Sequence, residues 1–107
     1  AIGAKEKSLK RKIMSTPIVI DNPKLQRFEL AVGHNVAIAS YTLDQDNKIV
    51  SITQVVTPEA LRGQGIAGKL MEGVVQIVRA REQKIIPICP YAVSWLKKHK
   101  EHQDLVL

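Results

Sequence analysis

Cysteine, aromatic residues and long apolar runs are scarce in this sequence, and each shortage excludes a class of protein. A single cysteine, Cys89, leaves no partner for an internal disulfide and rules out a multi-cysteine metal site. Aromatic residues make up 4% of the 107 residues, which leaves few side chains for stacking on nucleic-acid bases. No apolar run approaches the roughly 20 residues of a membrane span. We therefore expect one small domain without a metal site or a membrane partner, and the lone thiol is typical of a cytoplasmic protein.

Positive charge is in excess, but it is unevenly distributed. The formal net charge is +6, and residues 1–14 contain five basic residues against one glutamate. A basic segment with little periodic apolar content is typical of a flexible tail. We expect such a tail at 1–14 and a single domain at 15–107. Because the charge is concentrated in the tail and aromatic residues are few, nucleic acid is an unfavoured partner.

The remainder of the chain predicts a mixed sheet. Four runs rich in β-branched residues are separated by turn residues, at 16–21, 26–32, 36–43 and 48–57. Their order predicts an antiparallel meander. The last run is apolar at neighbouring positions, which predicts that both of its faces are mostly buried.

The second half changes to a helical period. Six apolar residues recur at three- and four-residue spacing and predict one buried helix stripe within 66–83: Ile66, Leu70, Met71, Val74, Val75 and Val78. A short strand at 84–89 follows, and its Pro87 favours a sheet edge or a bulge. A second helix is expected at 91–102, and 104–107 would form a last strand or simply pack. The predicted class is α/β (α+β), an antiparallel meander followed by a β-α-β crossover and a C-terminal helix.

Glycines at the start of the first helix are typical of a phosphate-binding loop. They allow close approach of the backbone, and the unpaired N–H groups of a helix start suit phosphate oxygens. Gly63, Gly65 and Gly68 also spell G-x-G-x-x-G, the dinucleotide fingerprint, which should follow the first strand of its unit and precede an acidic residue by about 20 positions. Here the glycines follow the fourth strand, and the next strand leads into CPYAV, which has no carboxylate. The dinucleotide interpretation fails, and a flexible loop without a ligand remains the alternative.

The segment TPEALRGQGIAGKL, followed by IIPICPY and WLKKHKEHQDLV, resembles the GNAT N-acetyltransferase superfamily, and most closely its small single-domain members. The resemblance covers about residues 16–107. It implies that backbone N–H groups of the loop hold the pyrophosphate of acetyl-CoA, and that the pantetheine arm pairs with the preceding strand. The implied loop residues are Arg62, Gly63, Gln64, Gly65, Ile66 and Ala67, with Gly68 and Lys69 in the first helical turn. The implied strand residues are Val55, Val56 and Thr57.

Two residues after the fifth predicted strand are candidates for the chemistry. The resemblance makes Cys89 the leading catalytic candidate, either as a nucleophile that accepts the acetyl group or as a lining of the acyl pocket. The start of a helix can favour a thiolate, whereas the alternative is a small buried core residue. Tyr91 would donate a proton to the departing CoA thiolate, or would be an amphipathic core residue.

One position departs from the family pattern. Many small members carry a histidine where this chain has Gln54, and glutamine cannot act as a general base. The sequence therefore supports two functions. The first is an acetyl-CoA-dependent N-acetyltransferase acting on an amine of a protein or small molecule, and the second is a non-catalytic CoA-binding module. The C-terminal residues His99 and His102 are interpreted as part of a solvated, lysine-rich face, and Trp95 as an anchor of the last helix on the sheet.

Overall fold

One mixed sheet forms the centre of the protein. The computed structural model describes residues 18–107, so the tail expected at 1–14 lies outside the described residues. The strands are β1 (Val19–Asn22), β2 (Arg27–Val32), β3 (Asn35–Asp44), β4 (Ile49–Val56) and β5 (Lys84–Pro87), and they lie in that order across the sheet. Neighbours from β1 to β4 are antiparallel, whereas β5 runs parallel to β4. The predicted meander, the crossover and the edge position of β5 are confirmed.

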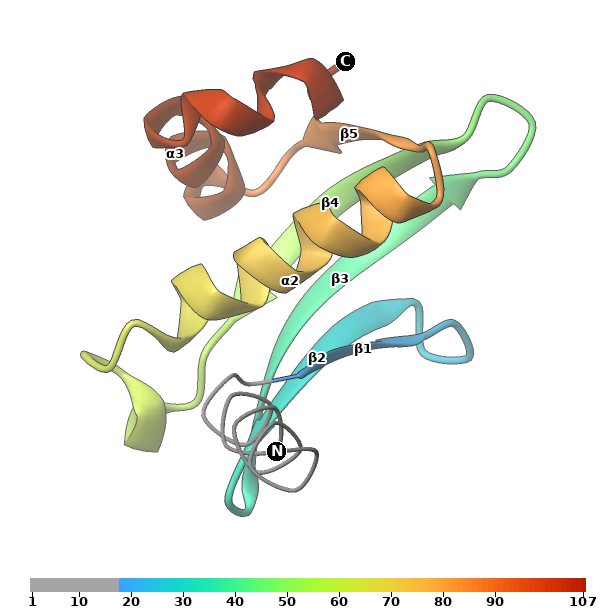
Figure 1. The fold of residues 1–107 in the computed structure, drawn as a ribbon. Coiled ribbons are helices and arrows are strands. Elements are labelled where there is room, and N and C mark those ends of the chain that lie inside the picture. The colour runs from blue at the N-terminus through green and yellow to red at the C-terminus, as the bar shows by residue number, and fades with distance from the viewer. Residues whose placement is uncertain (1–17) are drawn as a thin grey trace, which may run out of the picture.

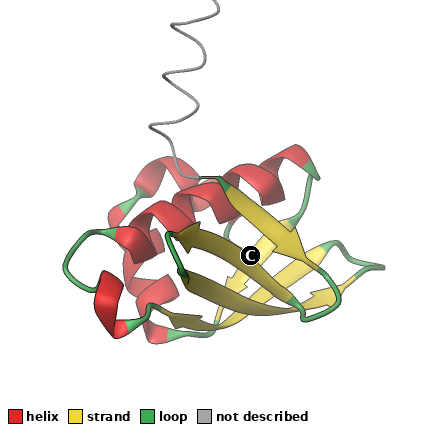
Figure 2. Ribbon diagram, turned by 90° about the horizontal axis from the view of Figure 1, so that it is seen from below, coloured by secondary structure: helices red, strands yellow, loops and turns green. Residues whose placement is uncertain are grey.

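Four helical segments connect or follow the later strands: η1 (Glu59–Leu61), α2 (Ile66–Ala80), α3 (Pro90–Lys98) and η2 (Lys100–Leu105). Figure 1 shows α2 crossing the sheet in front of β3 and β4. In Figure 2 the helices gather on one side of the molecule and the strands on the other. No described helix has the length and apolar character that a membrane crossing requires.

The core lies between α2 and the sheet. All six residues of the predicted apolar stripe are buried, which confirms the helical period inferred from the sequence. They share one buried cluster with Phe28, Leu30 and Ile52 of the sheet. Burial of a large aliphatic or aromatic side chain contributes about 1.5–3 kcal/mol. This packing fixes the position of α2, and with it the glycine loop that precedes the helix.

Two expectations about local structure are wrong. The sequence predicts burial of both faces of β4, yet Gln54 is exposed and Val56 is 38% exposed. The reason is that the described helices all cover the same face. The second predicted helix ends at Lys98, and the chain continues as η2. Of the two alternatives for 104–107, packing is correct, with a single parallel bridge from Val106 to Ile85.

Candidate functional site

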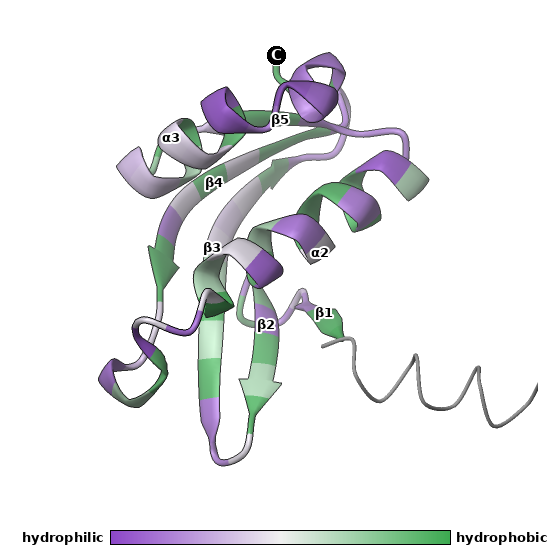
Figure 3. Cartoon of the chain, turned by 60° about the vertical axis from the view of Figure 1, so that its left-hand side comes forward, coloured by the Kyte–Doolittle hydropathy of each residue, from purple (hydrophilic) through white to green (hydrophobic). Residues whose placement is uncertain are grey.

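Strands β4 and β5 part at Ile52, and the two form a fork there. The carbonyl oxygen of Ile52 accepts hydrogen bonds from the backbone N–H groups of Ile88 (2.9 Å) and Cys89 (3.0 Å). Beyond this point β4 pairs with β3 alone, as Figure 3 shows where β4 runs past the end of β5. The other backbone edge of β4 therefore has no strand partner among residues 18–107. An extended ligand that carries amide groups can pair with such an edge.

A β-bulge lies next to the fork. The register between β3 and β4 shifts between Ser40 and Tyr41, which leaves Thr53 as the extra residue of β4. The Thr53 hydroxyl donates a hydrogen bond to the backbone oxygen of Ser40 (3.2 Å). Because a bulge bends its strand and increases the local twist, it helps β4 to diverge from β5. Sequence reasoning missed this feature, since an inserted residue leaves no clear signal in a β-branched run.

The loop before α2 presents unpaired donors. Gly63 (φ 81°) and Gly65 (φ 72°) adopt left-handed conformations, and Gly65 is the N-cap of α2. A Cβ atom at either glycine would meet no heavy atom within 4 Å, so the backbone faces open space there. Within residues 18–107, no N–H group of 63–68 makes a hydrogen bond of good geometry, whereas Lys69 N–H already bonds to the Gly65 oxygen (3.2 Å). These free donors, at the positive end of the helix dipole, suit an anion.

Two long side chains brace this loop. Arg62 Nε donates to the backbone oxygen of Thr57 (3.4 Å), and Gln64 Nε2 donates to that of Ala60 (3.2 Å). Both contacts fold the loop back over η1. In this structure Arg62 therefore connects the end of β4 to the glycine loop.

The third glycine has a different role. Gly68 is helical, and a Cβ atom there would lie 3.5 Å from Trp95 Nε1 and 3.7 Å from the hydroxyl oxygen of Tyr91. Gly68 thus marks the place where α2 and α3 approach each other, and it brings Tyr91 beside the first turn of α2.

A cavity of about 570 Å³ joins these parts. Nine of the predicted cofactor-binding residues and the predicted catalytic Tyr91 line it: Val55, Val56, Thr57, Arg62, Gly63, Gly65, Ile66, Ala67, Gly68 and Tyr91. Leu61 lines it too and was not predicted, although an apolar residue at the end of a polar linker is a usable signal. The predicted Gln64 and Lys69 are exposed and lie outside this lining. The structure thus brings the unpaired edge of β4 and the free donors of the loop to one cavity.

The two predicted catalytic residues differ in accessibility. Cys89 is 9% exposed, precedes α3 as its N-cap, and is not part of the cavity lining. Tyr91 is 39% exposed and lines the cavity. Partial burial raises the pKa of the Tyr91 hydroxyl above its ordinary value, so this group carries its proton at neutral pH. That is the state which a proton donor needs.

The interpretation of the C-terminal histidines as a solvated face is wrong. His99 stacks on Trp95 with ring centroids 3.9 Å apart. His102 also stacks on Trp95, with ring centroids 5.8 Å apart. The chain turns at His99 into η2 and returns over Trp95. The indole, expected to anchor α3 on the sheet, is 7% exposed and also packs against Gly68 of α2.

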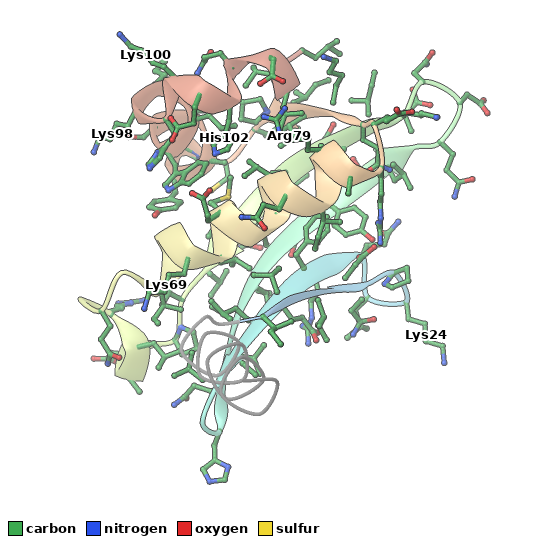
Figure 4. All side chains as sticks on the ribbon, viewed as in Figure 1. Lys24, Lys69, Arg79, Lys98, Lys100 and His102 are labelled. Carbon is green, nitrogen blue, oxygen red and sulfur yellow. The ribbon has the colours of Figure 1, made fainter. Side chains whose placement is uncertain are left out.

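A polar cluster holds the C-terminal segment against α2. Arg79 donates two hydrogen bonds to the Asp104 carboxylate (2.7 and 3.1 Å), and its guanidinium lies 3.4 Å from His102 Nδ1. His102 Nε2 in turn lies 3.4 Å from a Glu72 oxygen. Figure 4 shows Arg79 and His102 close together between α2 and the C-terminal segment. These contacts support the position of α3, and therefore of Tyr91.

Comparison with known proteins agrees with this geometry. Residues 27–105 match the model of the family described as GCN5-related N-acetyl-transferase. The chain belongs to this family. It is also similar to an NMR structure of a "GCN5-like putative N-acetyltransferase" from Staphylococcus aureus, with 28% sequence identity over 87% of this chain and 90% of that chain, and a TM-score of 0.65. A search of curated proteins finds no match. The predicted superfamily and fold are confirmed, and the chain is an acetyltransferase by family.

Proposed function

We propose that this protein transfers an acetyl group from acetyl-CoA to an amine. The observation that carries the proposal is the continuity of one cavity from the unpaired edge of β4 to the free N–H groups of the glycine loop. The N–H groups of 63–68 would donate hydrogen bonds to the pyrophosphate oxygens. The backbone of Val55, Val56 and Thr57 would pair with the amides of the pantetheine arm, as an added strand pairs with a sheet edge.

Tyr91 is the proposed proton donor. Acetyl-CoA supplies the acetyl group in activated form, as a thioester. The Tyr91 hydroxyl lines the cavity beside the fork and would protonate the sulfur as the bond to the acetyl carbon breaks. The burial and position of Cys89 favour a packing role at the fork over that of a nucleophile, because a nucleophilic sulfur must reach the acetyl carbon.

The cofactor site is tested by placing a negative charge among the free donors. Ala67 lines the cavity in the first turn of α2, and Ala67→Glu would oppose phosphate while suiting the helix dipole. We expect the Kd for acetyl-CoA, measured by calorimetry, to rise at least about tenfold, which corresponds to about 1.4 kcal/mol. The melting temperature without ligand should not fall. Gln76→Glu makes the same charge change on an exposed position of α2 and should leave the Kd unchanged.

The proposal fails if acetyl-CoA at millimolar concentration neither raises the melting temperature of the unaltered protein nor gives a calorimetric signal. A non-catalytic CoA-binding module is the second candidate, favoured by the exposed Gln54 in place of a histidine. It predicts acetyl-CoA binding without release of CoA thiol above background for any amine in a broad panel.

A further inference from the structure

The face of the sheet opposite the helices gives access to the fork. Gln54 lies opposite Ser40, and Val56 lies opposite Ile38, all on this face. Their neighbour Val55 lies opposite the buried Ala39 and therefore faces the helices. An acceptor that approaches over Gln54 and Val56 would meet the end of the cavity that Val55, Val56 and Tyr91 line.

The charged and titratable groups around the fork are poorly suited to remove a proton from an acceptor. On the open face, Glu29 of β2 accepts hydrogen bonds from Arg27 (2.6 Å) and Asn22 (3.1 Å), which hold the pKa of its carboxyl below the ordinary value. On α3, the raised pKa of Tyr91 makes it a proton donor at neutral pH. On the loop, Arg62 and Lys69 carry positive charge and are not bases.

Other groups are too distant or otherwise engaged. His34 lies in the β2–β3 turn. It precedes Ile38 by four residues, and Ile38 is the β3 residue nearest that turn that still pairs with β4. His99 and His102 stack on Trp95 on the helical side. Glu59 of η1 is exposed and does not line the cavity, and the Cys89 thiol is buried. Within residues 18–107, the fork is thus surrounded mainly by uncharged groups, with Gln54 at the point of entry.

We infer that the acceptor is a weakly basic amine, such as the α-amino group of a peptide, of which about a tenth is uncharged at pH 7, rather than the ammonium of a lysine side chain. The inference rests on the proposed acetyl transfer. A terminal α-amine has a pKa of about 7.7–8.0 and a lysine about 10.4, so the α-amine holds roughly 300-fold more free base at pH 7. Because the site removes no proton, the pKa of the acceptor sets the fraction of acceptor molecules that are uncharged and able to react. Arg62, a cation in the cavity lining, disfavours a cationic acceptor further.

The reaction balances without a protein base. The lone pair of the neutral amine forms a bond to the thioester carbon, and the carbon–sulfur bond breaks. The departing sulfur takes the hydroxyl proton of Tyr91. The extra proton of the acylated nitrogen passes to water, and Tyr91 regains its proton from water. The products are an N-acetyl amine and free CoA thiol.

Two peptides of otherwise identical sequence test the inference. One has a free α-amine and no lysine, and the other has a blocked N-terminus and one lysine. At pH 7 we expect kcat/KM for the α-amine to exceed that for the lysine at least about tenfold, and the ratio to shrink as pH rises toward 10 and lysine loses its proton. Equal values at pH 7, a preference for lysine, or a ratio independent of pH would overturn the inference.

A gain-of-function variant tests the physical cause. Gln54→His should raise kcat/KM for the lysine peptide at pH 7 at least about tenfold, since a positioned base contributes about 10²–10⁴-fold. Thr42→His adds a histidine to an exposed β3 position in the region where β4 still pairs with β5, and should change nothing. No gain in a folded Gln54→His protein with unchanged acetyl-CoA affinity would contradict the inference. If calorimetry shows no acetyl-CoA binding, or if no amine in the panel is acetylated, the proposed function itself fails; acetylation of other amines but of neither peptide defeats the inference alone.

Discussion

At the scale of single residues, the two tyrosines of this chain provide a natural comparison. Tyr91 lines the cavity, whereas Tyr41 is buried in the core and donates a hydrogen bond to Asp21 (2.6 Å). Both are phenols in partly desolvated surroundings that raise their pKa values. Only the first lies where a proton can pass to a departing thiolate, so position rather than acidity separates their proposed roles.

Tyr91→Phe should therefore lower kcat by about 10²-fold, a typical loss for a general acid, with little change in the Kd for acetyl-CoA. Because the pKa of Tyr91 lies above its ordinary value of 10.0, the hydroxyl stays mainly protonated up to that pH. We therefore expect kcat with a neutral acceptor to remain constant up to the same pH. Steady-state kinetics across pH measures both effects. Tyr41→Phe is the matched control and should retain kcat at neutral pH. An unchanged kcat in Tyr91→Phe would exclude the phenol from proton transfer.

At the scale of elements, two glycines at the start of α2 differ in how strongly the structure constrains them. Gly65 ends the loop in a left-handed conformation, which a side chain makes costly. Gly68 has an ordinary helical conformation, and a Cβ atom there would make only normal van der Waals contacts with α3. Glycine is thus needed for the backbone conformation at position 65, whereas position 68 has room for a Cβ atom.

The different constraints on Gly65 and Gly68 predict different effects of alanine on the free energy of unfolding. Gly65→Ala should lower the free energy of unfolding by about 1 kcal/mol. Gly68→Ala should leave it unchanged or raise it by up to about 1 kcal/mol, because alanine favours the helix. Urea denaturation of the two variants measures the difference. Equal losses of stability would show that the two positions are constrained in the same way.

At the scale of the whole molecule, Asp21 connects three separate elements. Its carboxylate accepts a hydrogen bond from Tyr41 of β3, and its second oxygen lies 2.7 Å from Arg81 at the end of α2. Asp21 itself belongs to the edge strand β1. Burial and the contact with Asp21 raise the pKa of Tyr41 to about 12, because both disfavour its ionised form.

The raised pKa of Tyr41 predicts a loss of stability at alkaline pH. Tyrosine in the unfolded chain ionises near pH 10. The contribution of Tyr41 to the free energy of unfolding is therefore complete below pH 10 and is lost as pH rises toward 12. Two pKa units correspond to roughly 2–3 kcal/mol. Melting temperatures between pH 9 and 12 should fall more steeply for the unaltered protein than for Tyr41→Phe. Parallel curves would show that Tyr41 does not contribute to the alkaline transition.

Much of this architecture was accessible from the sequence. The helical period predicted all six buried residues of α2, and glycine and proline predicted the loop and the edge position of β5. The exposure of one face of β4 could not be predicted from the sequence, because an apolar run is compatible with burial on one or both sides. The stacking of His99 and His102 on Trp95 was also missed, since a lysine-rich composition resembles a solvated helix until the chain turns back.

The sequence by itself determined the order of elements, the glycine loop and the family, because these follow from local patterns of apolar residues, turns and spacing. Only the tertiary structure decided where β4 and β5 separate, and that Tyr91 rather than Cys89 lines the cavity. It also decided that Gln54 faces the open side of the sheet. Such features depend on a bulge, on the register between strands and on the approach of two helices. These are contacts between distant segments, which residue spacing along the chain does not encode directly.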